Sequence, residues 1–213
     1  MLSYPNIFKA VVKDYDRNNL AYHNIAHINR MNCNALDMLQ QHCLELDCQV
    51  GAGDVQVLAL AILGHDIRYV PGASDNEARS ATRMAEIIKK SGDGLQDWVA
   101  KDVCRLILGT AGEIPCDDLV GRVLHDLDWL VFASPIVKYS QEYLRPLYVE
   151  YLNVIDPEKF FDGRREFLRA LEPRMFCSSM MNTRYAANVK TNIDWELDIY
   201  LPFRIETRER GCI

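Results

Sequence analysis

Residues 58–66 read Leu58-Ala59-Leu60-Ala61-Ile62-Leu63-Gly64-His65-Asp66, a run of apolar side chains that ends in an imidazole and a carboxylate. A segment that is apolar on every side is typical of a helix buried in a core. Two polar groups at its buried end cost free energy unless something compensates them. A cation is the simplest partner for both groups. The alternative is that His65 and Asp66 cap the helix and hydrogen-bond to each other.

Apolar residues recur at spacings of three and four throughout the chain, which predicts an all-α fold of about eight or nine helices. Short clusters of Gly, Pro, Ser and Asp separate the helical patterns. The segment Asp66–Val70 runs into Pro71-Gly72 and is expected to leave the doublet as an extended loop. The expected helices span residues 5–14, 24–46, 54–65, 76–90, 95–108, 117–131, 135–154, 157–171 and 182–200.

Length and charge narrow the functional class. The chain has 213 residues, enough for one substantial core, so a single domain over residues 1–213 is expected. A formal net charge of −6 without a Lys or Arg cluster argues against a dedicated nucleic-acid surface or a basic membrane patch, and favours small-molecule substrates. No apolar run is long enough to span a bilayer and no secretory signal is recognised, so a cytoplasmic location is expected. The seven cysteines are expected to be reduced and mostly buried.

Two further histidines lie in the segment Tyr22-His23-Asn24-Ile25-Ala26-His27. Asn24 is a suitable N-cap, which places His27 inside the helix and leaves His23 in the loop that enters it. Near one cation, His27 is the better ligand, and His23 at the rim is suited to donate a proton to a leaving group. The alternative for His23 is a surface or capping histidine.

The segment around residue 127 supplies one more carboxylate. At about 100° per residue, Asp126 and Asp128 fall on opposite shoulders of an apolar stripe, so only one of them faces a given pocket. The periodicity leaves open which one, and it places His125 on the solvent side. Imidazoles and carboxylates together suit one borderline or hard divalent cation. The stripe consists of Leu119, Val120, Val123, Leu124, Leu127, Leu130 and Val131.

With these residues the chain resembles the HD superfamily of metal-dependent phosphohydrolases, in which a His, a His-Asp doublet and a distant Asp bind the metal. It is most similar to a branch of predicted hydrolases with a Tyr-His-Asn-x-x-His segment, a helix that ends in His-Asp, and a loop leading to Asn-Glu-x-x-Ser. The last motif stands here as Asn76-Glu77-Ala78-Arg79-Ser80. The similarity extends to nearly all the chain beyond Leu20, including Val149-Glu150-Tyr151, residues 163–168, Asn192 and Glu196.

The resemblance implies a single HD-type helical bundle, with a metal-site core at about residues 20–135 and C-terminal helices at about 135–205 packed on it. It implies Asp128 as the last ligand, because the superfamily places that ligand in an Asp-x-Asp-x-Leu or Ala-Asp-x-Leu setting; Asp126 remains the alternative. The Tyr-His-Asn-x-x-His segment is also similar to the cyclic-nucleotide phosphodiesterases, which implies the same roles for His27 and His23.

One departure from the superfamily concerns the number of metals. No histidine lies between His65 and His125, where two-metal members place extra ones. One tightly held divalent ion is therefore expected, whether Mn, Co, Ni, Fe, Zn or Mg, with His27, His65, Asp66 and Asp128 as ligands. Glu113 lies in that interval and is expected to be a solvated loop residue.

The function that the resemblance implies is a metal-dependent phosphohydrolase that acts on a nucleotide or another small phosphate ester through a metal-activated water. The candidate catalytic residues are His23, Asp66 and Glu77, the last as a group that orients the water or a ligand histidine. The candidate substrate-binding residues are Tyr22, Asn24, Arg79 and Arg164, together with Arg68.

Two other functions fit the same fold. One is an HD-type oxygenase with two irons, which needs more histidines than this chain offers. The other is a non-catalytic module that binds a nucleotide or a partner protein and keeps the metal for folding. A homo-oligomer is also compatible with the sequence, because the aromatic series Tyr139, Tyr143, Tyr148 and Tyr151 suits an interface as well as a core.

Overall fold

The structure is a computed structural model that describes residues 4–111, 118–171 and 175–209. Every regular element in these ranges is helical and none is a strand, which confirms the predicted all-α class. The chain contacts form two compact units, Met1–Asp128 and Trp129–Ile213. Their boundary falls near residue 135, where the C-terminal helices are expected to begin; the single domain stays a prediction. Within the described ranges, no helix is both long and apolar enough to cross a membrane.

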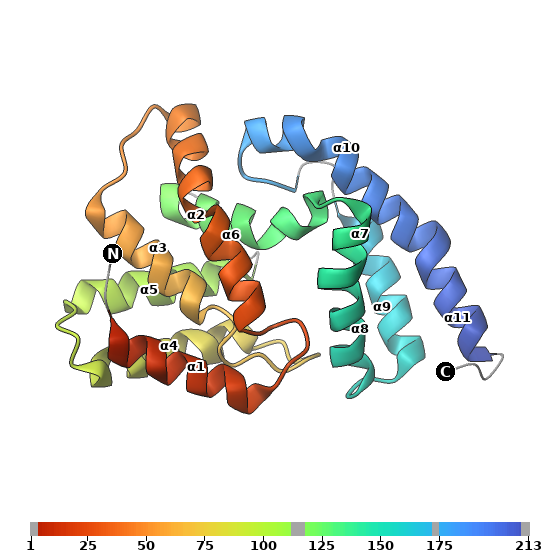
Figure 1. Ribbon diagram of the computed structural model, residues 1–213, viewed down its shortest axis with the longest axis horizontal. Coiled ribbons are helices and arrows are strands. Elements are labelled where there is room, and N and C mark those ends of the chain that lie inside the picture. Colours follow the sequence, from red (N-terminus) through yellow and green to blue (C-terminus); the bar gives the residue numbers. More distant parts are fainter. Residues whose placement is uncertain (1–3, 112–117, 172–174, 210–213) are drawn as a thin grey trace. The chain divides into compact units, whose positions relative to one another are not determined.

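The first unit is built around α3 (Figure 1). This helix contacts α1, α2, α4 and α5, and it buries apolar side chains such as Leu58, Leu60 and Ile62. A Cβ atom at Gly64 would lie 2.8 Å from the Cγ and Sδ atoms of Met84, so only glycine lets α4 pack this closely against the last turn of α3. The unit comprises α1 (Pro5–Asn18), α2 (Ile25–Leu46), α3 (Ala52–Gly64), α4 (Asn76–Ser91), α5 (Asp97–Gly109) and α6 (Leu119–Trp129), whose last residue belongs to the second unit.

The segment after α3 differs from its prediction. It continues as turns, in which the N–H of Ile67 donates to the carbonyl of Gly64 and the N–H of Tyr69 donates to the carbonyl of Asp66. The extended loop predicted for Asp66–Val70 is therefore wrong, because Ile67 is fully buried and is drawn into the core by another turn. Further on, the side chain of Asn76 binds both the N–H and the carbonyl of Val70, which holds the loop against the start of α4.

The second unit contains two π-helical turns, η2 (Tyr139–Leu144) and η3 (Glu196–Tyr200). Each is followed at the second residue of the next helix by a proline, Pro146 or Pro202, which removes an N–H donor and crowds the preceding turn. The wider turn relieves that crowding. The other elements are η1 (Leu130–Ala133), α7 (Ile136–Lys138), α8 (Arg145–Leu152), α9 (Pro157–Ala170), α10 (Ser179–Trp195) and α11 (Leu201–Glu209).

A buried polar cluster joins these turns to α9. The guanidinium of Arg164 binds both carboxylate oxygens of Glu196, at 2.7 Å through Nε and 3.0 Å through Nη2. Its Nη1 donates to the hydroxyl of Tyr143 at 2.9 Å, and Tyr139 donates its hydroxyl proton to Glu196. Arg164 is 8 % exposed and Glu196 is 0 % exposed. We call these four residues the Arg164 cluster.

Two predictions need correction, one on the burial of the cysteines and one on the bounds of the last helix. Of the seven cysteines, the five that the structure describes are free but none is buried; Cys33 and Cys48 are exposed because they lie on the outer side and just past the end of α2. Cys116 and Cys212 lie outside the described residues. The last predicted helix, residues 182–200, begins earlier because Ser178 caps it, and α11 continues the helical path to Glu209.

Candidate metal centre

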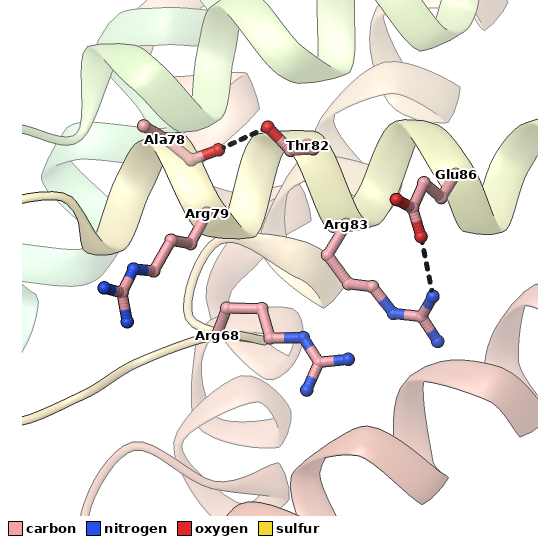
Figure 2. A pocket seen from close by; sticks show the side chains of 6 residues that line it. All are labelled: Arg68, Ala78, Arg79, Thr82, Arg83 and Glu86. Carbon is pink, nitrogen blue, oxygen red and sulfur yellow. Dashed lines mark hydrogen bonds and ion pairs between the residues drawn. The ribbon is translucent and has the colours of Figure 1, made fainter.

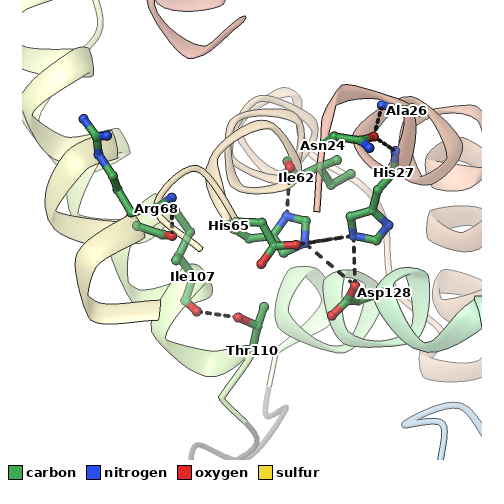
Figure 3. A network of polar contacts seen from close by, with 11 residues as sticks. Asn24, Ala26, His27, Ile62, His65, Arg68, Ile107, Thr110 and Asp128 are labelled. Carbon is green, nitrogen blue, oxygen red and sulfur yellow. Dashed lines mark hydrogen bonds and ion pairs between the residues drawn. The ribbon is translucent and has the colours of Figure 1, made fainter. Parts of the chain in front are cut away.

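Four predicted ligands lie near one another within the first unit, and Figure 3 labels three of them, His27, His65 and Asp128. His27 lies in the first turn of α2, His65 and Asp66 follow α3 directly, and Asp128 lies in the last turn of α6. The Nε2 atoms of His27 and His65 are 3.2 Å apart. Asp66 Oδ2 lies 3.0 Å from His65 Nε2, and Asp128 Oδ1 lies 3.2 Å from His27 Nε2. The two longer cross-distances from these carboxylate oxygens to the imidazoles are 3.6 and 3.8 Å.

This arrangement fits a divalent cation. The ligand atoms of His27, His65 and Asp66 all lie within 4.8 Å of one another, close enough to share one ion. Asp128 approaches this group from the side of His27. His65 Nδ1 donates to the carbonyl of Ile62 at 3.0 Å, so in the neutral ring the Nε2 lone pair points into the cluster. Both imidazoles are buried, whereas the side chain of Asp128 is 30 % exposed and opens the site to solvent. Two imidazoles and two carboxylates suit the divalent ions from Mn to Zn.

Burial and charge set the protonation of the ligands. Burial lowers the pKa of His27, and Asp128 opposes this only in part. Burial also acts to lower the pKa of His65, but the charges of Asp66 and Asp128 outweigh it and raise that pKa well above its ordinary value. Burial acts to raise the pKa of Asp128, but hydrogen bonds from His27 and His65 hold it well below its ordinary value. A proton on His65 therefore balances the carboxylates until a cation replaces it.

We expect metal binding to weaken as the pH falls. His65 keeps its proton at neutral pH because its pKa is raised, and a cation has to displace that proton to use Nε2. The affinity for Mn²⁺ or Zn²⁺ should therefore decrease between about pH 8 and pH 6, with proton release on binding. Calorimetric titrations in two buffers of different ionisation enthalpy measure both quantities. A constant affinity without proton release would contradict the proposed ligand set.

The alternative ligand Asp126 lies elsewhere. It is fully buried, with Oδ2 2.9 Å from His42 Nε2 and Oδ1 3.1 Å from His125 Nδ1. Asp126 and Asp128 thus face opposite sides of α6, as the periodicity predicts, and Asp128 is the one beside His27. The solvated position predicted for His125 is wrong: its side chain is 18 % exposed because the carboxylate of Asp126 holds it against the helix.

The residues that precede His27 support the centre. The side-chain oxygen of Asn24 accepts from the N–H groups of Ala26 and His27, and its amide donates to the carbonyls of Leu20 and Ala21. All its polar atoms are used in fixing the start of α2, so it positions His27 rather than a substrate. Tyr22 is buried with its ring 4.9 Å from that of His27, centroid to centroid.

His23 lies beside the ligands without joining them. Its ring stacks on Tyr69, with centroids 3.5 Å apart and 13° between the planes, and its centroid is 6.4 Å from that of His27. The side chain is 9 % exposed. The stacking on Tyr69, which the sequence analysis did not identify, fixes the plane of the His23 ring.

Tyr15 is a second residue that the sequence analysis did not identify. It lies in α1, is 2 % exposed, and its hydroxyl has no hydrogen-bond partner among the described residues. Burial raises the pKa of Tyr15 well above its ordinary value, and the charges of Asp66 and Asp128 raise it further, whereas the backbone of Asp66 acts to lower it. A buried hydroxyl next to the ligands is a group that a bound ligand or water can satisfy.

Among the described residues, the candidates Glu77 and Arg79 make no hydrogen bond or ion pair with the four ligands. Glu77 is half-buried in the first turn of α4 and has no hydrogen bond or ion pair with another described residue. Arg79 is half-exposed and pairs with Asp75. Arg164 is in the second unit, where the Arg164 cluster engages its guanidinium. Glu113 lies outside the described residues.

Comparison of the chain with family models, with curated proteins and with solved structures finds no match.

Proposed function

We propose that this chain is a metal-dependent phosphohydrolase that acts on a nucleotide or another small phosphate ester. The observation that carries the proposal is the convergence of His27, His65, Asp66 and Asp128 from α2, the end of α3 and α6. The ligand atoms of the first three lie within 4.8 Å of one another, and Asp128 Oδ1 lies 3.2 Å from His27 Nε2. The resemblance of these residues to the HD superfamily supplies the reaction class. The helical fold agrees with that class, and the side chain of Asp128 is 30 % exposed.

The side chains supply the binding and orientation that this chemistry needs. A divalent cation at the site lowers the pKa of water and stabilises negative charge on phosphoryl oxygens. Asn24 and the carbonyl of Ile62 hold the two imidazoles in place. His23, held flat by Tyr69 at the edge of the centre, is positioned to protonate the leaving group.

Metal reconstitution tests the proposal. The purified chain, freed of metal and then supplied separately with Mn, Co, Ni, Fe, Zn or Mg, should hydrolyse members of a phosphoester and nucleotide panel with at least one ion. The His23→Asn variant should lose about 100-fold in kcat on alkyl phosphates, because general acid catalysis contributes at least that factor. The same variant should lose much less on 4-nitrophenyl phosphate, whose leaving group needs no proton.

The leaving group is the internal control of this experiment. Equal losses on both ester classes would show that His23 supports the site without donating a proton. Absence of turnover with every ion, together with metal-dependent melting, would favour a non-catalytic binding module. Two irons per chain and an oxygen-dependent colour change would favour the oxygenase.

A further inference from the structure

A second charged site lies in the first unit, on α4 and the turn before it (Figure 2). A pocket of about 470 Å³ is lined by Arg68, Ala78, Arg79, Thr82, Arg83 and Glu86. The pocket is an open surface hollow, and Ala78, Arg79, Thr82 and Glu86 of its lining are exposed. None of the lining residues is one of the four candidate metal ligands. Figure 3 shows the guanidinium of Arg68 directed away from His65 and Asp128.

A buried carboxylate holds two of the arginines in place. Asp14 of α1 is 1 % exposed, and it binds Nη2 of Arg68 at 3.4 Å and Nε of Arg83. Arg17 adds a third guanidinium 3.8 Å from the same carboxylate. The backbone N–H of Arg68 donates to the hydroxyl of Ser80 at 3.1 Å, which ties the turn to α4. The arginines are thus ordered before any ligand arrives, which reduces the entropy cost of binding one.

The pocket retains unused donors. Each guanidinium has five N–H groups. Among the described residues, the side chain of Arg79 bonds only through Nε, to Asp75, which leaves both its terminal amino groups available to a ligand. Arg68 bonds only through Nη2 of its side chain, and Arg83 uses Nε and Nη1, the latter with Glu86. The ion pair of Arg79 with Asp75 is half-exposed and therefore weak, so an anion in the pocket can compete for it.

We propose that this pocket binds a small phosphate-bearing anion, independently of the metal centre. Planar guanidiniums with free terminal amino groups match the oxygens of a phosphate in bidentate fashion. With Arg17, four arginines stand against the carboxylates of Asp14, Asp75 and Glu86, and the excess of one positive charge favours an anion over a neutral ligand. The proposal concerns a site other than the metal centre and stands whether or not the chain hydrolyses phosphate esters.

Binding of inorganic pyrophosphate to the metal-freed chain, measured by calorimetry at low ionic strength, tests the proposal. One pyrophosphate should bind per chain. Arg79→Ala should weaken it about 10-fold or more, the size expected for lost hydrogen bonds to a charged group. Arg105→Ala is the matched control, because Arg105 is 49 % exposed, pairs with Asp118 and lies on α5. His65→Ala, which removes the imidazole whose raised pKa makes it the cation of the metal-free centre, should bind pyrophosphate as the wild type does.

Three outcomes would overturn the proposal. Absence of binding to the wild-type chain would show that the pocket takes no phosphate anion. Equal weakening by Arg79→Ala and Arg105→Ala would show that binding depends on the net charge of the protein and not on this pocket. Loss of binding in His65→Ala would place the anion at the metal centre. Arg68→Ala provides a second variant on the opposite wall, and thermal melting of each variant checks that it folds.

Discussion

His65→Ala is expected to remove metal binding and to lower any phosphohydrolase activity by several orders of magnitude. His65 Nε2 lies 3.2 Å from His27 Nε2 and 3.0 Å from Asp66 Oδ2, so its loss removes the ligand atom between the other two. Removing even an outer partner of a metal ligand costs about 10–100-fold in affinity or activity, and removing the ligand costs more. Elemental analysis after dialysis, together with rates on the best substrate, measures both effects.

His125→Asn provides the matched control for His65→Ala. His125 is also largely buried beside an aspartate, but it contacts Asp126 on the other side of α6. This variant should retain its metal. Loss of metal with His125→Asn, and retention with His65→Ala, would place the ion at a different cluster and contradict the assignment.

Glu196→Ala is expected to destabilise the fold by about 3–5 kcal/mol, because it leaves the guanidinium of Arg164 buried without its counter-charge. Chemical denaturation followed by circular dichroism measures the change. On α9, the helix that carries Arg164, Asp162→Ala removes the exposed ion pair with Arg165 and should cost about 0–1 kcal/mol.

A double variant separates charge from packing in this cluster. Glu196→Leu combined with Arg164→Met replaces the pair by apolar side chains and should restore most of the stability that Glu196→Ala loses. If the double variant is as unstable as the single one, the hydrogen bonds to Tyr139 and Tyr143, rather than the buried charge, determine the cost.

Local sequence pattern was enough to predict the helical class and three of the converging residues, His27, His65 and Asp66, whereas Asp128 was selected by the resemblance. His65 and Asp66 follow an apolar helix, and Asn24 is the N-cap of the helix that carries His27. Residue type and position therefore identify these three ligands. Periodicity placed Asp126 and Asp128 on opposite faces of the helix, but it did not show which of these faces meets the imidazoles. That choice depends on how α6 packs against α2 and α3, which is a tertiary property. Metal binding itself stays a prediction.

Contacts between residues that are far apart in the sequence could not be predicted from the sequence pattern. Arg164 has the appearance of a phosphate ligand in a motif, and only the fold brings Glu196 to it. Tyr15 and Tyr69 have the pattern of core aromatics, and their closeness to Asp66 and His23 depends on how α1 and the turn after α3 pack. The π-helical turns break the 3.6-residue repeat on which the analysis relied.

The two imidazoles of the centre occupy helix ends of opposite polarity. His27 follows the N-cap Asn24 in the first turn of α2, where the backbone dipoles disfavour a positive ring. His65 is the C-cap of α3, where the dipoles favour one. These fields act in the same direction as the burial that lowers the pKa of His27 and as the carboxylates that raise that of His65. The two histidines therefore differ in their affinity for a proton. The neutral form is favoured at His27, and the protonated form is favoured at His65.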